Sequence, residues 1–165
     1  MELRFQVQTK IQKPVAEVFD AVYNPGKLSG YFTNGGASAA LDEGTTVLWA
    51  FADNPDDEKI KFPVKVTKVI PNELIVLGWE GAKGPDTRVE MNFEETGPDE
   101  TLVKISETGW RENQSDLNSS YGNCMGWSQM LSALKAFVEY GINLRKGAYG
   151  GLYKVAEKKT AADAE

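Results

Sequence analysis

The chain has 165 residues, of which 41% are hydrophobic, and it carries 18 basic against 24 acidic side chains, a net charge of −6. This length predicts one domain with a hydrophobic core, and the acidic balance argues against nucleic acid and anionic membrane surfaces as partners. The sequence contains no histidine, which excludes histidine-based catalytic triads and histidine-ligated zinc.

The expected location follows from segments that the sequence lacks. No window approaches the ~18 consecutive apolar residues of a membrane span, and the N-terminus lacks the basic-then-apolar order of a signal peptide. The single cysteine, Cys124, cannot form a disulfide within the chain and fits a reducing compartment. We expect a soluble, cytoplasmic protein without a membrane span, a metal site or a cofactor.

The first part of the chain predicts one strand and two short helices. Residues 3–8 alternate apolar and polar side chains, which is typical of a strand with one buried face. Apolar residues at helical spacing then predict a short amphipathic helix that follows Pro14 and includes Val22. A second small helix or turn is expected at residues 27–32, before a glycine-rich break.

Alternation with a period of two continues through the middle of the chain. Turn residues separate the alternating segments, and such short connections make neighbouring strands antiparallel. Together with the first strand, the segments predict a sheet of about seven strands. The expected strands are residues 37–41, 45–52, 59–70, 73–81, 87–95 and 101–109.

The stretch from Ser119 to Lys146 predicts a long helix with one continuous apolar face. At about 100° per residue, its large apolar side chains fall within an arc of roughly 140°. A polar loop at residues 108–118 should precede the helix, and Gly147 should end it. Near its C-terminal end, Val138 and Ile142 are expected to pack in the core.

These elements can bury their apolar faces only if the sheet curls around the long helix, with the two short helices closing one end. The predicted fold class is therefore α+β, a helix-grip fold in which an antiparallel sheet wraps around a long C-terminal helix. We expect residues 1–151 to form a single domain. Residues 152–165 lack apolar content and are expected to be a disordered tail.

Glu107 stands out in the last strand, because the alternation places this carboxylate on the inward face. An inward carboxylate is costly unless it is paired, hydrogen-bonded or near water. The interpretation that the pattern favours is a strand that twists outward at its end, which leaves Glu107 solvated or paired with Arg88 or Arg111.

Gly122 and Gly126 lie one helical turn apart near the start of the long helix. Each costs about 1 kcal/mol relative to alanine inside a helix, and small residues on one face allow a ligand or a backbone to approach closely. The alternative is that the helix begins only near Gly126 and that Gly122 belongs to a loop.

Several segments together resemble the SRPBCC superfamily of START-like helix-grip proteins. Within it, they are most similar to the C-terminal domain of the activator of the ninety-kilodalton heat-shock ATPase, over about residues 3–147. The segments that carry the resemblance are KPVAEVFDAV, LSGYF, VTKVIPNELIVLGWEG, ETGW and GWSQMLSALKAFVEYGINLR.

This resemblance implies an apolar cavity between the sheet and the long helix, which in the superfamily accommodates lipids, sterols, polyketides or other hydrophobic molecules. The superfamily has no shared catalytic residues, so none is assigned, and Glu107 and Tyr31 are only weak candidates. Each large apolar side chain taken alone is more typical of core packing. The expected cavity residues are Trp49, Phe51, Trp79, Met91, Phe93, Glu107, Trp127, Met130, Leu131 and Leu134.

Three functions follow as hypotheses. The first is non-catalytic binding of a small hydrophobic ligand, such as a lipid, a sterol or a polyketide-like molecule, in the cavity. The second is a co-chaperone-like interaction module that acts on a heat-shock ATPase. The third is an acid/base cyclase or hydrolase that uses a carboxylate in the cavity.

Overall fold

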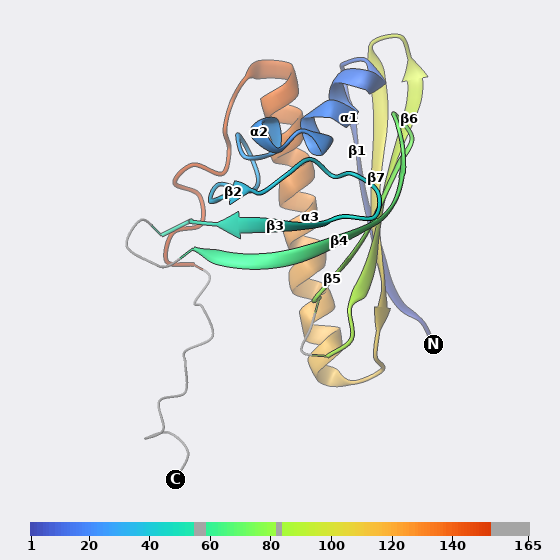
Figure 1. Cartoon of the computed structure of the whole chain (residues 1–165), viewed down its shortest axis with the longest axis vertical. Helices are drawn as coiled ribbons and strands as arrows, with labels where there is room; N and C mark the ends of the chain where they lie inside the picture. The colour runs from blue at the N-terminus through green and yellow to red at the C-terminus, as the bar shows by residue number, and fades with distance from the viewer. Residues whose placement is uncertain (55–58, 82–83, 153–165) are drawn as a thin grey trace.

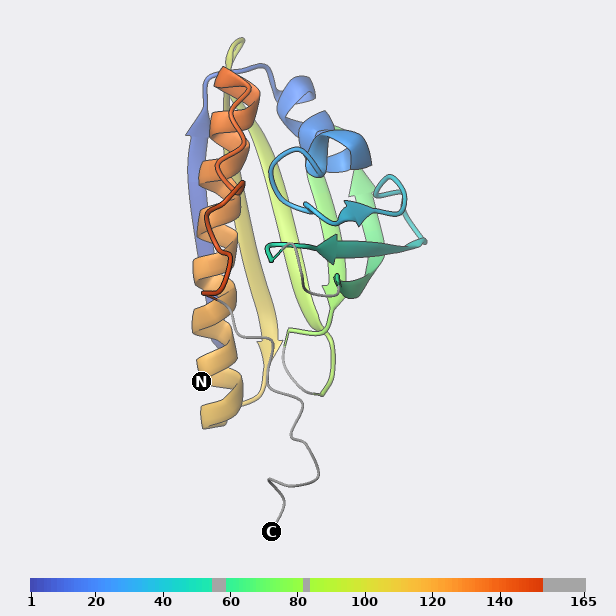
Figure 2. The same ribbon diagram turned by 90° about the vertical axis from the view of Figure 1, so that its left-hand side faces the viewer.

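The computed structural model describes residues 1–54, 59–81 and 84–152. Over these residues a seven-stranded antiparallel sheet curls around one long helix, and two short helices close one end (Figures 1 and 2). The expected α+β helix-grip fold is confirmed, whereas the predicted tail lies almost entirely outside the described residues. The strands are β1 (Leu3–Ile11), β2 (Gly36–Ala37), β3 (Thr46–Phe51), β4 (Ile60–Ile70), β5 (Leu74–Trp79), β6 (Thr87–Gly97) and β7 (Glu100–Trp110), and the helices are α1 (Val15–Tyr23), α2 (Pro25–Leu28) and α3 (Gln114–Tyr140).

The sheet order is β1-β7-β6-β5-β4-β3-β2, so the first strand pairs with the last and every other pair is adjacent in the chain. α3 packs against β1 and β7, and the remaining strands curve away to its right in Figure 2. The strand expected at residues 37–41 is reduced to β2. The regular backbone hydrogen bonding between β2 and β3 ends there, because the Ser38 hydroxyl, rather than a backbone carbonyl, accepts a hydrogen bond from the N–H of Leu48 (2.8 Å).

α3 begins earlier than the sequence pattern indicates. The side chain of Asn113 accepts a hydrogen bond from the backbone N–H of Asp116 (2.8 Å) and caps the helix, which therefore starts at Gln114. Since β7 runs to Trp110, the loop expected at residues 108–118 shrinks to residues 111–113.

The C-terminal end of α3 also comes earlier than expected. Gly141 adopts a left-handed conformation (φ 68°) and ends the helix before Gly147. Val138 packs against the core as predicted. Ile142 lies beyond the helix and is 50% exposed, so its predicted core position is wrong. The following residues run back beside α3 toward the end of β3 (Figure 1).

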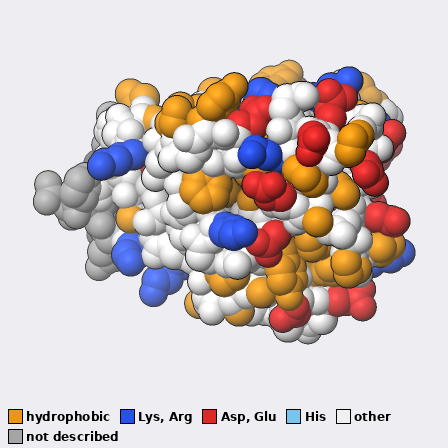
Figure 3. All heavy atoms as spheres, turned by 90° about the horizontal axis from the view of Figure 1, so that it is seen from above, with side chains coloured by type: hydrophobic (Ala, Val, Ile, Leu, Met, Phe, Trp, Pro, Cys, Tyr) orange, Lys and Arg blue, Asp and Glu red, His pale blue; other side chains and the backbone are white. Residues whose placement is uncertain are grey.

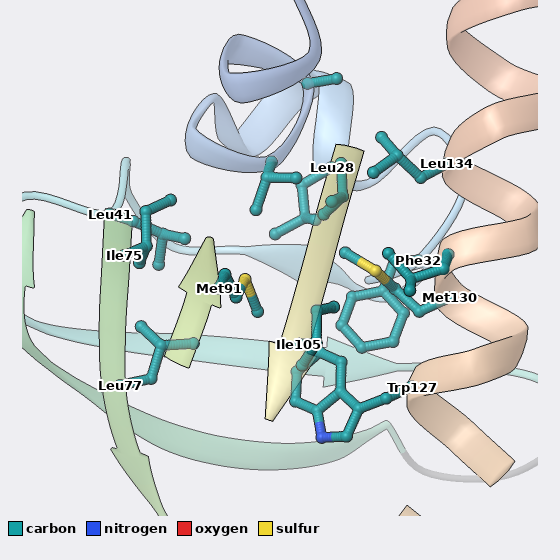
Figure 4. Packing of buried hydrophobic residues seen from close by; sticks show 14 of the residues in the cluster. Leu28, Phe32, Leu41, Ile75, Leu77, Met91, Ile105, Trp127, Met130 and Leu134 are labelled. Carbon is teal, nitrogen blue, oxygen red and sulfur yellow. The ribbon is translucent and has the colours of Figure 1, made fainter. Parts of the chain in front are cut away.

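The core lies between the concave face of the sheet and α3. Figure 4 shows Ile75, Met91 and Ile105 of the sheet on one side, and Met130 and Leu134 of α3 on the other. All of these side chains are at most 2% exposed. Among the described residues, no helix is long and apolar enough to cross a membrane.

The end of the molecule closed by α1 and α2 presents a mixed surface. Acidic side chains are spread over much of it and are interspersed with hydrophobic and basic ones (Figure 3). This distribution agrees with the net charge of −6.

Glu100 links the start of β7 to the end of β1. Its carboxylate accepts hydrogen bonds from Gln12 (3.0 Å) and Thr96 (2.9 Å) and pairs with Lys10 (3.1 Å). These contacts, the one with Gln12 first, lower the pKa of Glu100 from 4.5 to about 2. A pKa depressed by folding adds stability that is complete above about pH 4.5 and is lost as the pH falls toward 2.

Replacing this carboxylate should flatten the acid side of the stability profile. We expect Glu100→Gln to lose less unfolding free energy than the parent protein between about pH 5 and about pH 2, because Gln does not titrate. Urea denaturation at several pH values in this interval measures the effect. Parallel profiles for the two proteins would contradict it.

Candidate functional site

A pocket of about 280 Å³ opens between the N-terminal half of α3 and the ends of β3, β4 and β5. Five of its twelve lining residues are aromatic, and the polar groups lie among these rings. The lining residues are Phe32, Phe51, Asp53, Ile60, Phe62, Trp79, Gly122, Asn123, Gly126, Trp127, Gln129 and Arg145.

The helical wall of the pocket is formed in part by Gly122 and Gly126. Both lie inside α3, so the alternative that Gly122 belongs to a loop is wrong. Apart from its chain neighbours and the backbone of its own helical turns, a Cβ atom placed on either glycine would meet no atom within 4 Å. The two glycines therefore leave open space on the helix side, where a longer side chain would project into the pocket.

The aromatic side chains that line the pocket pack against one another. The ring centroids of Trp79 and Trp127 are 5.4 Å apart, and those of Phe62 and Trp79 are 5.8 Å apart. Phe32 extends the cluster to Trp127 at 5.7 Å, and Phe51 extends it to Phe62 at 5.9 Å. Such pairs favour fixed ring orientations, so the walls of the pocket are largely preformed.

Glu107 lies directly behind this aromatic wall and is fully buried. Its Oε1 atom accepts hydrogen bonds from Trp79 Nε1 (2.9 Å), Thr87 Oγ1 (2.7 Å) and Asn123 Nδ2 (3.1 Å). Its Oε2 atom accepts from Trp127 Nε1 (3.1 Å) and again from Asn123 (3.2 Å). One carboxylate thus positions three residues that line the pocket, contributed by β5 and α3.

The interpretation of Glu107 as a solvated or arginine-paired residue is wrong. β7 remains in register with β6 past this position, so the side chain stays on the inward face. Arg88 pairs instead with Glu90, and Arg111 pairs with Asp116. The inward position is tolerated because five hydrogen bonds replace the water that the carboxylate loses.

The residues expected to line the cavity separate into three groups. Phe51, Trp79 and Trp127 line the pocket, and Glu107 lies behind it. Phe93 is buried and borders a separate groove that also includes Pro71 and Lys104. The others belong to the packed core and not to the lining of this pocket: Trp49, Met91, Met130, Leu131 and Leu134.

Tyr31 is not positioned for acid/base chemistry in this pocket. Its hydroxyl donates a hydrogen bond to the backbone carbonyl of Ala21 (3.0 Å), and the ring packs against Phe137. Burial raises the pKa of Tyr31 well above its ordinary value of 10.0, which disfavours proton release near neutral pH.

Arg145 closes one side of the pocket. It comes from the segment after α3, and its guanidinium donates to both carboxylate oxygens of Asp53 (2.9 and 2.7 Å). The guanidinium carbon also lies 4.9 Å from the ring centroid of Phe51. Since both members of the ion pair are only about one-sixth exposed, this contact is better shielded than an ordinary surface pair.

The sequence pattern did not identify several lining residues. Asn123 precedes Trp127 by four positions, so the two project from the same face of α3, and this spacing is a signal that could have found it. Arg145 falls inside the helix that the sequence predicts, and only the end at Gly141 brings it to the pocket. The missed residues are Phe32, Asp53, Ile60, Phe62, Asn123, Gln129 and Arg145.

Residues 12–139 match the family described as activator of Hsp90 ATPase homolog 1-like protein. The chain belongs to this family. The match extends from the turn before α1 almost to the end of α3, and it includes every lining residue of the pocket except Arg145. In the comparison with curated proteins, none matches this chain.

Several solved structures share the fold of this chain. Protein SSP2350 from Staphylococcus saprophyticus is 24% identical, with a TM-score of 0.71 over 87% of this chain and 97% of its own. The Aha1 dimer from Colwellia psychrerythraea is 22% identical, with a TM-score of 0.68 over 84% of this chain and 98% of its own. DynU16, from the dynemicin biosynthetic locus, is 22% identical, with a TM-score of 0.72 over 87% of this chain and 50% of its own. At these identities the similarity shows the fold alone.

Proposed function

We propose that this protein binds a compact, largely apolar small molecule in the pocket between α3 and the ends of β3, β4 and β5, without chemistry of its own. The observation that carries the proposal is a wall of aromatic rings that faces open space beside two helical glycines. Small-molecule sites are typically concave and apolar, with a few placed polar groups. Here Asn123, Gln129 and Arg145 supply the polar groups.

The size of the pocket favours a compact ligand. Ligand pockets commonly measure about 300–1,000 Å³, and this one, at about 280 Å³, lies just below that range. A compact aromatic molecule suits this volume better than a sterol or a long acyl chain.

The contacts of Glu107 favour binding over catalysis. Trp79, Asn123 and Trp127 stand between the carboxylate and the pocket, and all three donate hydrogen bonds to it. A general acid or base must come within hydrogen-bond reach of the reacting atom. Glu107 therefore serves in this proposal as a positioning residue for the pocket walls.

A substitution on α3 that fills the pocket tests this proposal. We expect Gly126→Leu to weaken the binding of a neutral fluorescent aromatic probe, N-phenyl-1-naphthylamine, by about tenfold or more, because the new side chain occupies the open space. The fold should be retained, since leucine is a better helix former than glycine by about 0.8 kcal/mol. Fluorescence titration measures binding, and thermal unfolding checks the fold.

Ser128→Leu is the matched control for this test. It adds a leucine two residues further along α3, at an exposed position outside the lining of the pocket. The control should bind the probe as the parent protein does. Equal affinities for Gly126→Leu and the parent protein would refute the pocket as the binding site, and the absence of binding in the parent protein would refute the proposed function.

A second candidate function is that of an interaction module acting on a heat-shock ATPase. The family match favours it, because the family is described by its likeness to an activator of the Hsp90 ATPase. This function would use an exterior surface, so stimulation of ATP turnover by Hsp90 should survive Gly126→Leu. A lack of stimulation by the parent protein would exclude this candidate.

A further inference from the structure

The charged and polar groups around the pocket carry information about the charge of a ligand, which the shape of the pocket does not. Glu107 is fully buried, and its hydrogen-bond partners are two indoles, one hydroxyl and one amide, all of them neutral. Every one of these groups can donate to an ionised carboxylate, which only accepts. Within the described part of the chain, no lysine or arginine forms an ion pair with this carboxylate.

The charged side chains that line the pocket do not offset Glu107. Asp53 and Arg145 form a two-pronged ion pair, with N–O distances of 2.9 and 2.7 Å, and so balance each other. Among the described residues of this site, Glu107 is therefore the acidic side chain that has no basic partner. It lies one side chain behind the wall, in surroundings that screen charges less than water does.

The rings of the wall are of the kind that attracts cations. Tryptophan is the side chain that binds cations best through its ring face, and Trp79 and Trp127 both line the pocket. Their N–H groups donate to Glu107, and a hydrogen bond to an anion polarises the indole so that its ring becomes more electron-rich.

The rim of the same pocket already holds a cation against aromatic rings. The guanidinium carbon of Arg145 lies 4.9 Å from the ring centroid of Phe51 and 5.8 Å from that of Phe32. These distances fall within the roughly 6 Å over which a cation is attracted to a ring. The outer rings are therefore used for this interaction by the chain itself. Of the two inner indoles, Trp79 is partly exposed to the pocket, whereas Trp127 is only 2% exposed.

We propose that the ligand of this pocket carries a positive charge, as an amine or a quaternary ammonium group on a compact apolar body. The indole of Trp79 contacts the cation, and Glu107 behind it supplies the opposite charge. This inference rests on the proposed function and narrows it to one ligand class. The competing class is an anionic ligand that binds Arg145 in place of Asp53.

Three probes of similar shape and different charge test the ligand class on the parent protein. They are benzyltrimethylammonium, its uncharged carbon analogue neopentylbenzene, and phenylmethanesulfonate. We expect the ammonium probe to bind about tenfold or more tightly than neopentylbenzene, although the neutral probe is the more hydrophobic, and the sulfonate to bind most weakly. Tryptophan fluorescence titration at low salt measures all three, and added salt should reduce the difference.

The outcomes separate the inference from the function on which it rests. If neopentylbenzene or the sulfonate binds as tightly as the ammonium probe, the inference is overturned while small-molecule binding stands. If none of the three binds and N-phenyl-1-naphthylamine also fails to bind, both are overturned.

Glu107→Gln tests the source of the preference, because it removes the charge and keeps the size. We expect this variant to lose most of its preference for the ammonium probe over neopentylbenzene. Glu94→Gln is the matched control, since it removes an exposed carboxylate from β6. A folded Glu107→Gln variant with an unchanged preference would overturn the role of Glu107, and the probe series on the parent protein decides the ligand class whether or not the variant folds.

Discussion

Glu107→Leu should lower the free energy of unfolding by about 3–5 kcal/mol. Leucine has nearly the same size, but it leaves two indole N–H groups, the Thr87 hydroxyl and the Asn123 amide without their shared acceptor. A buried polar group without a partner costs about 1–3 kcal/mol, so the loss exceeds what burial of leucine returns. Urea denaturation, followed by tryptophan fluorescence and by circular dichroism, measures the change.

The control for this prediction is Glu94→Leu on the exposed side of β6, which should change the unfolding free energy by less than about 1 kcal/mol. A Glu107→Leu variant that is as stable as the parent protein would contradict the positioning role. The burial of a charge in that position would then be a net cost to the fold.

Leu134→Ala should lower the free energy of unfolding by about 2–5 kcal/mol. Leu134 is fully buried in the core between α3 and the sheet and is not part of the pocket lining (Figure 4). Truncation there removes apolar contacts and leaves a cavity that the surrounding side chains fill only in part. Urea denaturation of both proteins measures the difference.

Leu144→Ala makes the same truncation at a position that is 48% exposed, and it should cost well under 1 kcal/mol. If Leu134→Ala were equally mild, Leu134 would border open space, and the ligand cavity would extend deeper along α3 than the pocket described above.

The sequence predicted the fold because periodicity reports which face of an element is buried. Alternation in β3 and β5 identified Trp49 and Trp79 as inward residues, and both belong to the core cluster or pack against it. The long apolar stripe identified α3 as the element that the sheet surrounds. Its ends were misplaced because Asn113 and Gly141 control them, and capping depends on local backbone geometry more than on periodicity.

The candidate site could be predicted only in part. Periodicity shows that Met130 and Trp127 both face inward, but it does not show whether neighbouring side chains fill the space beside them. That depends on contacts between distant segments, such as the rings of Phe32 and Phe62, which approach α3 from other parts of the chain.

Glu107 illustrates the same limit. Its inward position followed from alternation along β7, yet the expected outcome was a strand that turns outward. Three of its four donors, Thr87, Asn123 and Trp127, lie 16 to 20 residues away in the chain, and Trp79 lies 28 residues away. No local pattern indicates that four such donors converge on one carboxylate.

The most direct test of the account is to locate a bound aromatic cation on the protein. Nuclear Overhauser effects between benzyltrimethylammonium and the protein report contacts at single residues. We expect contacts from the ligand to the indole protons of Trp79 and to the Cα protons of Gly122 and Gly126. Contacts confined to another surface, such as the groove beside Phe93, would contradict it.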